Sequence, residues 1–90
     1  MLRTFSITVS GNVQGVFYRQ STREKAQALS ITGTVANRPD GTVQMVATGT
    51  TEQLEQLVDW CKQGTLRAVV SSVHVEEVAA QVFKDFTIQR

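Results

Sequence analysis

Cysteine, histidine and proline each occur only once in this 90-residue chain, as Cys61, His74 and Pro39. A single cysteine cannot form an internal disulfide bond, and an unpaired thiol favours a reducing compartment. One cysteine and one histidine, thirteen positions apart, are also too few to hold a structural zinc ion. We therefore expect a protein with neither a disulfide framework nor a metal site.

The chain also lacks a large excess of charge of either sign. Nine Lys and Arg residues are balanced by eight Asp and Glu residues, for a formal net charge of +1, whereas nucleic-acid-binding proteins usually carry a strong basic excess. Long apolar runs are missing too: the first ten residues, MLRTFSITVS, alternate in polarity, and no later segment is long enough to span a membrane. We expect a cytoplasmic protein that binds neither nucleic acid nor membranes.

A chain of this length supports one hydrophobic core, so residues 1–90 are expected to form a single domain. Several short segments alternate between apolar and polar residues, as strands with one buried face do. The segment Arg38-Pro39-Asp40-Gly41 separates two of them and contains the proline and glycine of a tight turn, which predicts a hairpin. The expected strands are Phe5–Val9, Gly33–Asn37, Thr42–Gly49, Val69–Glu76 and, at an edge of the sheet, Phe86–Ile88.

Two other segments have helical spacing. The stripe expected on the helix Arg19–Leu29 consists of Thr22, Ala26 and Leu29. A second helix is expected to begin after Thr50, an N-cap with Gln53 three residues on, and to end near Gly64; its stripe consists of Leu54, Leu57, Val58 and Cys61. The order βαββαβ predicts an α+β fold of the ferredoxin-like, split βαβ type, with both helices on one face of an antiparallel sheet.

The most unusual stretch is GNVQGVFYR, residues 11–19, between the first expected strand and the first helix. A strand that ends in glycines and leads directly into a helix points several unpaired N–H groups into one small concavity, which suits an anion. A side chain at Gly11 or Gly15 would obstruct the tight turn or the close approach of a ligand. Arg19 lies at the helix start, where the helix dipole disfavours a cation, but its guanidinium there can contact two oxygens of a bound tetrahedral oxyanion.

A purely structural role fits the same residues. Arg19 can be a solvated surface residue, and the glycines can serve only to make a turn. Under either interpretation, we expect Gln14 to brace the loop by hydrogen bonds. From the residues alone, both interpretations remain open. A Walker-type loop is disfavoured, because no Gly-Lys-Ser or Gly-Lys-Thr follows, and nucleotide hydrolysis is disfavoured with it.

The stretch GNVQGVFYR resembles the acylphosphatase signature, Gly-x-Val-Gln-Gly-Val-x-(Phe or Tyr)-Arg, at every fixed position. The second motif of that family, Gly-aromatic-Val-x-Asn, three residues, Gly-x-Val, five residues, Gly, is matched in its spacing by residues 33–49. Thr34 stands where the family usually has an aromatic residue, and Ala36 where a basic residue is common; we expect both beside the site, where they bear on substrate preference. The ending FTIQR, residues 86–90, is also of the family's kind, so the resemblance spans the chain.

The resemblance implies hydrolysis of acyl phosphates to a carboxylate and inorganic phosphate, with no metal and no cofactor. It implies that Asn37 positions the attacking water and that Arg19 acts in catalysis as well as in binding. The partners implied are a small-molecule acyl phosphate and inorganic phosphate, as product and inhibitor, and the protein is expected to be a monomer. The phosphate-binding residues implied are Gly15, Val16, Phe17, Tyr18 and Arg19.

This chemistry agrees with the residue types present. A carboxylate is a good leaving group, so the reaction requires no general acid, and neither motif offers one. Phosphoryl transfer can proceed by positioning and electrostatic stabilisation, which backbone amides, one arginine and one amide side chain can supply.

Other residues have simpler roles. We expect Cys61 and Trp60 to pack in or beside the core, His74 to be an exposed strand histidine, and the rings of Phe17 and Tyr18 either to line the site or to pack. Taken alone, Asn37 would be a turn former.

A binding module is the alternative class of function, because the ferredoxin-like fold also serves such domains. RNA recognition is disfavoured, since the segment TVQMVATG contains no aromatic residue for base stacking. A phosphate-binding or carbamoyl-phosphate-binding module without turnover remains open.

Overall fold

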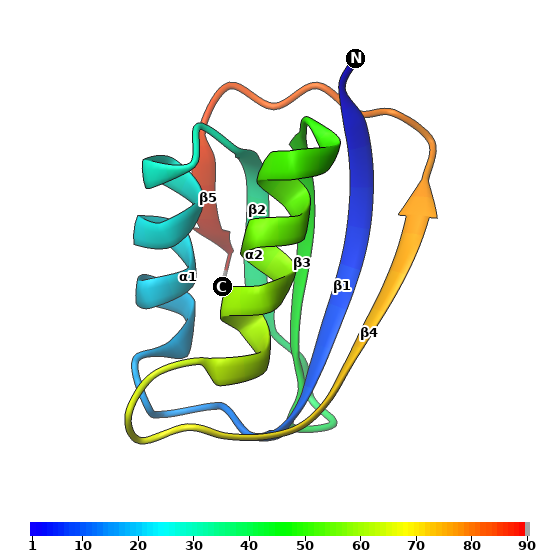
Figure 1. Cartoon of the computed structure of the whole chain (residues 1–90). Coiled ribbons are helices and arrows are strands. Elements are labelled where there is room, and N and C mark those ends of the chain that lie inside the picture. Colours follow the sequence, from blue (N-terminus) through cyan, green and yellow to red (C-terminus); the bar gives the residue numbers. More distant parts are fainter. Residues whose placement is uncertain (90) are drawn as a thin grey trace.

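The computed structural model describes residues 1–89, in which two helices pack against one sheet (Figure 1). Arg90, the last residue of the FTIQR ending, lies outside the described residues. Each helix and strand expected from the sequence is present, with bounds that differ by a few residues. The elements are β1 (Arg3–Asn12), α1 (Tyr18–Ala28), β2 (Thr32–Asn37), β3 (Val43–Gly49), α2 (Thr51–Gln63), β4 (Val69–Val78) and β5 (Phe86–Gln89).

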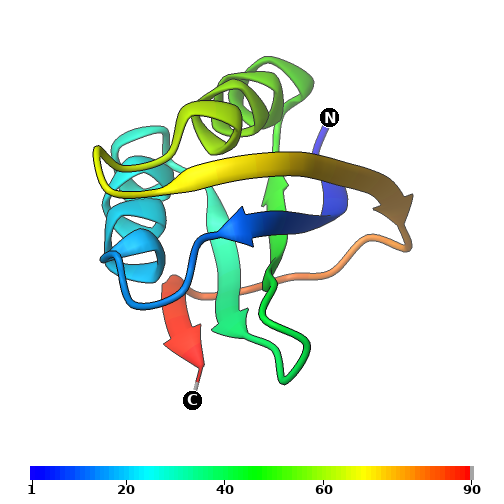
Figure 2. The same cartoon turned by 90° about the horizontal axis from the view of Figure 1, so that it is seen from below.

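The sheet has the strand order β4-β1-β3-β2-β5. The pairs β1–β3, β1–β4 and β2–β3 are antiparallel, which confirms the ferredoxin-like α+β fold. The β2–β5 pair is parallel, so the sheet is mixed rather than antiparallel throughout, and the prediction was wrong in this detail. The reason is visible in Figures 1 and 2: the chain leaves β4 at the end of the sheet where β2 begins, crosses that end, and enters β5 running beside β2.

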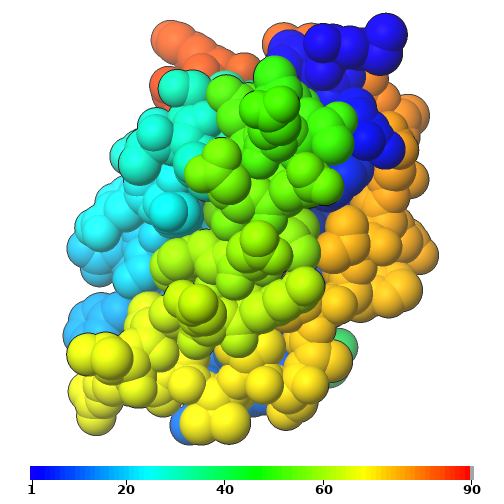
Figure 3. Space-filling view, viewed as in Figure 1, coloured from blue at the N-terminus to red at the C-terminus, as the bar shows by residue number. Residues whose placement is uncertain are grey.

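Both helices cover the same face of the sheet, and in Figure 3 they occupy the left and the centre of the molecule, with β4 at the right. The helix α1 buries Tyr18, Thr22 and Ala26 at intervals of four residues, and α2 buries Leu54, Leu57 and Cys61. These stripes meet the apolar residues of the central strands, of which Ile7 and Val35 are fully buried. Neither helix within residues 1–89 combines the length and apolar character that crossing a bilayer requires.

The start of α2 has the capping box predicted from its sequence. The Thr50 hydroxyl accepts a hydrogen bond from the Gln53 N–H at 3.2 Å, and the Gln53 side chain accepts one from the Thr50 N–H at 2.8 Å. Two N–H groups that the helix cannot satisfy internally are therefore paired. The helix α1 has no such side-chain cap.

The segment that crosses the end of the sheet is fastened by two buried threonines on the face away from the helices. Gln81 N–H donates to Thr4 Oγ1 at 3.0 Å, and Thr48 Oγ1 donates to the Gln81 carbonyl at 2.9 Å. The two hydroxyls lie 2.7 Å apart, and Thr4 is the donor between them because the Thr48 proton is already used. This closed set of hydrogen bonds fixes the path by which the chain reaches β5.

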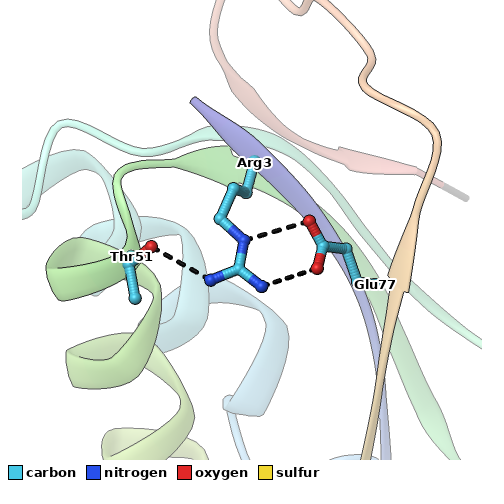
Figure 4. A network of polar contacts seen from close by, with 3 residues as sticks. All are labelled: Arg3, Thr51 and Glu77. Carbon is cyan, nitrogen blue, oxygen red and sulfur yellow. Dashed lines mark hydrogen bonds and ion pairs between the residues drawn. The ribbon is translucent and has the colours of Figure 1, made fainter. Parts of the chain in front are cut away.

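A polar network at the start of β1 joins three elements (Figure 4). The guanidinium of Arg3 donates to both carboxylate oxygens of Glu77 on β4, at 3.0 and 2.6 Å, and to the Thr51 hydroxyl on α2 at 3.1 Å. The hydrogen bonds and charge of Arg3 lower the pKa of the Glu77 carboxyl. The resulting stabilisation is present above the unfolded-state pKa and is lost as the pH falls through the folded-state pKa, but it is small because water screens both exposed groups.

Candidate functional site

A pocket of about 290 Å³ lies where the loop of residues 13–17 leads from β1 into α1. The loop and the first turn of α1 form most of its wall, and one residue of β5 completes it. Four of the five predicted phosphate-binding residues line the pocket, whereas the side chain of Val16 is buried in the core. The lining residues are Gly15, Phe17, Tyr18, Arg19, Gln20 and Ile88.

The N-terminus of α1 is uncapped. Its first helical hydrogen bond runs from the Ser21 N–H to the Phe17 carbonyl at 3.0 Å, so the N–H groups of residues 17–20 have no partner within the helix. Phe17, at the N-cap, makes no side-chain capping bond, and the first turn contains no acidic residue. The positive end of the helix dipole therefore points toward the pocket without compensation, as an anion-binding site requires.

The two glycines of the stretch GNVQGVFYR have different roles. At Gly11, φ is +126°, and a Cβ would lie only 2.1 Å from the Val69 carbonyl oxygen, so the close passage of β1 and β4 excludes any side chain. At Gly15, φ is +74° and a Cβ would meet nothing within 4 Å. Glycine is needed at position 15 because the backbone there is left-handed, and this conformation turns the loop toward the helix.

Arg19 lies in the first turn of α1, half-buried, with its side chain in the pocket wall. Within residues 1–89 it forms no ion pair with a carboxylate. No carboxylate of the described part of the chain therefore neutralises its positive charge, which adds to the field of the unpaired N–H groups. An oxyanion in the pocket would meet both.

Asn37 ends β2 and is not among the residues that line the pocket. The loop is nevertheless tied to the turn that directly follows Asn37, because Gln14 Nε2 donates to the carbonyls of Arg38 and Thr42 at 2.8 and 2.9 Å. The expected bracing role of Gln14 is confirmed. The Asn37 Oδ1 is buried and has no hydrogen-bond donor among residues 1–89, an arrangement that costs about 1–3 kcal/mol and calls for a ligand or water.

The C-terminal end of α2 supports the loop from the other side. The Tyr18 ring is buried against Trp60, with ring centroids 5.3 Å apart, and its hydroxyl donates to the Cys61 carbonyl at 2.7 Å. Burial, together with the interactions with Cys61, raises the pKa of Tyr18. The Thr65 hydroxyl donates to the Val16 carbonyl at 2.9 Å. These contacts of the Tyr18 side chain fix the position of the Tyr18 backbone N–H at the start of α1.

Two positions predicted beside the site lie elsewhere. Side chains alternate along β2, and Val35 is fully buried on the helix-covered face. Thr34 and Ala36 therefore point to the opposite face of the sheet, away from Ile88, which pairs with Val35 in register. The expectation that they lie beside the pocket was wrong, because sequence proximity to Asn37 says nothing about which face a strand residue occupies.

The remaining reactive side chains have the roles expected of them. Cys61 is fully buried, with its Sγ 3.8 Å from the Met45 sulfur, and burial raises the pKa of its thiol to about 12. The His74 side chain is 71% exposed on β4 and lies 3.4 Å from a Glu76 oxygen. Among residues 1–89, no three side chains from His, Cys, Asp and Glu gather in a way that could hold a metal ion.

We expect Cys61→Ala to leave turnover unchanged, because the thiol is buried, protonated and outside the pocket. The substitution removes one sulfur atom from the core and should lower the free energy of unfolding by about 1 kcal/mol, the scale of one buried methylene. Steady-state kinetics and denaturant titration measure the two effects. A large fall in kcat with intact folding would contradict the assignment of Cys61 to packing.

Comparisons with known proteins agree with the geometry. The sequence model of the family described as Acylphosphatase matches residues 5–88. A curated acylphosphatase of Marinobacter nauticus is 49% identical over 86 residues, which cover 94% of this chain and 94% of that protein. The structure of an acylphosphatase from Coxiella burnetii is similar with a TM-score of 0.95 at 40% identity, covering 98% of this chain and 93% of that one. An acylphosphatase from Bacillus subtilis gives the same TM-score at 32% identity, with full coverage of both chains.

Proposed function

Because this chain belongs to the acylphosphatase family, we propose that it hydrolyses the carboxyl–phosphate bond of acyl phosphates and releases a carboxylate and inorganic phosphate. The observation that carries the proposal is the uncapped N-terminus of α1, where unpaired N–H groups and the Arg19 side chain line one pocket. This arrangement suits a dianionic phosphoryl group, because several donors and one fixed positive charge converge on a small volume.

The phosphoryl group is held by the backbone N–H groups of residues 16–19, of which those of 17–19 are unpaired at the start of α1, and by the Arg19 guanidinium. The planar guanidinium donates to two phosphoryl oxygens together, which a point charge cannot do. These donors are fixed before the substrate arrives: Tyr18 is anchored on Cys61, and Val16 on Thr65. Preorganised donors stabilise the charge on the phosphoryl oxygens in the transition state without the cost of reorienting them.

The attacking water is positioned by Asn37. Its buried Oδ1 has no donor among residues 1–89, so it can accept a hydrogen bond from a water and leave an oxygen lone pair directed at phosphorus. The P–O bond to the carboxylate then breaks as the bond to the water oxygen forms, and the water's proton passes to a phosphoryl oxygen. The departing carboxylate is stable as an anion, so no side chain must protonate it.

We further propose that residues 1–90 act as one monomeric domain in the cytoplasm, without a metal or cofactor. The near-neutral charge balance and the single unpaired thiol support this proposal. The inhibitor expected is the product, inorganic phosphate, because it can occupy the same donors as the phosphoryl group of the substrate.

The test of the function is turnover of benzoyl phosphate by the purified protein in the presence of excess chelator. We expect steady release of benzoate and phosphate, at a rate that added divalent ions do not raise. Binding without turnover would identify a phosphate-binding or carbamoyl-phosphate-binding module instead. Activity that is lost on chelation and restored by a divalent ion would refute the metal-free mechanism.

Inorganic phosphate is expected to stabilise the protein and to compete with the substrate. Phosphate at 100 times its dissociation constant should add about 2.7 kcal/mol to the free energy of unfolding, because it binds only the native state. Thermal melts in phosphate and in chloride at matched ionic strength measure the specific effect. If saturating phosphate neither raises Tm nor inhibits turnover, the assignment of the pocket is wrong.

A further inference from the structure

Phe17 is unusual in two respects at once. Its side chain is 65% exposed, and its backbone has φ of 63°, the left-handed conformation that residues with a Cβ rarely adopt. Neither feature stabilises the fold, since the ring is largely in water and the backbone is strained. Strain of this kind is concentrated at functional sites, and the Phe17 ring stands in the wall of the pocket.

The second apolar residue of the wall comes from the far end of the chain. Ile88 on β5 pairs with Val35 in the parallel register, so it lies on the helix-covered face and is only half-buried there. Phe17 and Ile88 therefore meet at one pocket although they are 71 positions apart in the sequence. The crossing segment fastened by Thr4 and Thr48 brings β5 to this place.

The pocket thus has two chemically different parts. One part consists of the unpaired N–H groups and Arg19, which is the only charged residue that lines the pocket among residues 1–89. The other part consists of the Phe17 ring and the Ile88 side chain. An acyl phosphate has the same division, with a dianionic phosphoryl group joined to an acyl group.

We propose that Phe17 and Ile88 form the binding site for the acyl group and that they select acyl phosphates whose acyl group is aromatic or otherwise apolar. This inference rests on the proposed function. Residues 1–89 provide no second cation in the wall, so an acyl group that carries a second anionic group would be desolvated against apolar atoms there, which is unfavourable. The volume of about 290 Å³ is at the small end of ligand pockets and suits a small molecule.

The test compares kcat/KM for benzoyl phosphate with kcat/KM for acetyl phosphate in Phe17→Ala and Phe17→Gly. In both variants the benzoyl-to-acetyl ratio should fall about tenfold, the scale on which an apolar pocket discriminates between substrates. Glycine relieves the left-handed backbone and alanine does not, so a ratio that falls equally in both reports the ring and not the strain. Ile88→Ala should lower the ratio in the same direction by a smaller factor.

Two further measurements test whether the acyl group alone is affected. The inhibition constant of inorganic phosphate, which has no acyl group, should change less than KM for benzoyl phosphate. Val82→Ala serves as the control, because Val82 is 99% exposed and lies outside the pocket; its ratio should equal that of the wild type. If the wild type hydrolyses neither substrate, the proposed function fails. If it hydrolyses both, and both Phe17 variants keep a ratio within about twofold of the wild type, the acyl-group site is overturned.

Discussion

Arg19→Gln is expected to lower kcat/KM for benzoyl phosphate by roughly 10³-fold, the scale of removing an arginine from a phosphoryl-transfer site. The guanidinium contacts the phosphoryl group both in the bound substrate and in the transition state, so both KM and kcat should worsen. A neutral amide cannot replace the charge. The affinity for inorganic phosphate should fall about tenfold or more, because a hydrogen bond to a charged group contributes about 1.5–3 kcal/mol.

The control for this variant is Arg23→Gln, one turn further along α1. Arg23 is half-buried like Arg19 but does not line the pocket. The two variants therefore remove the same charge from the same helix and differ in whether the residue lines the pocket. We expect kcat/KM of Arg23→Gln to stay within a few-fold of the wild type. If both variants lose activity equally, the loss results from the lower positive charge of the helix and not from a contact that Arg19 makes with the substrate.

Arg19→Lys should remain poor although it keeps the charge. A lysine ammonium is a point charge and cannot donate to two oxygens from one plane. We expect it to recover part of the phosphate affinity lost in Arg19→Gln and little of kcat. If phosphate affinity and kcat both returned to wild-type values in Arg19→Lys, a bidentate contact would be contradicted. The role of Arg19 would then be long-range electrostatic attraction, which the salt dependence of KM would reveal.

Features that depend on neighbouring residues were predictable from the sequence. The capping box of Thr50 and Gln53 and the turn around Pro39 are determined by local hydrogen bonds and backbone preferences. The uncapped start of α1 follows from the order of residues in GNVQGVFYR itself. These signals are local, so the sequence carries them directly.

Other features depend on contacts between distant segments. The parallel pairing of β5 with β2, and with it the place of Ile88 in the pocket, results from a chain path fixed by Thr4, Thr48 and Gln81. No periodicity within residues 86–88 distinguishes parallel from antiparallel pairing. The participation of Gln20 in the wall was also missed, although the rule that the first four N–H groups of a helix are unpaired would have indicated it.

The left-handed backbone at Phe17 and the unpaired oxygen of Asn37 are local departures from what stabilises a fold. Sequence rules reveal an unfavourable residue only where neighbouring residues show the conflict, as at Arg19, and not where the rest of the fold imposes it. Phe17 lines the pocket, and Asn37 directly precedes the turn that Gln14 ties to the loop. This coincidence supports the interpretation that they are maintained for binding and catalysis.

Asn37→Ala is expected to lower kcat by roughly 10²-fold or more, the scale of losing one preorganised contact at a reacting centre. Asn37 is proposed to hold the attacking water, which matters only after the phosphoryl group is bound. The affinity for inorganic phosphate should therefore change little, in contrast to Arg19→Gln. Pre-steady-state turnover and phosphate inhibition measure the two quantities separately.

The stability of Asn37→Ala provides an independent readout, because a purely structural role for the side chain predicts a loss of Tm. In the wild type the buried Oδ1 has no protein donor among residues 1–89, so its removal breaks no hydrogen bond to that part of the protein and should leave Tm nearly unchanged. An asparagine that merely stabilised the turn would lower Tm when replaced. The expected combination is thus a slow enzyme that is about as stable as the wild type and still gains Tm from phosphate.

The matched control is Asn12→Ala, since Asn12 is the other asparagine of the chain and occupies a variable position of the loop motif, exposed at the end of β1. We expect its kcat to equal that of the wild type. A comparison of the two variants shows whether turnover requires the amide side chain of Asn37 specifically or is equally sensitive to the loss of an amide side chain elsewhere near the loop. If Asn37→Ala is folded, binds phosphate and keeps a kcat near that of the wild type, Asn37 does not position the water, and the unpaired Oδ1 must then be satisfied by a group that takes no part in the reaction.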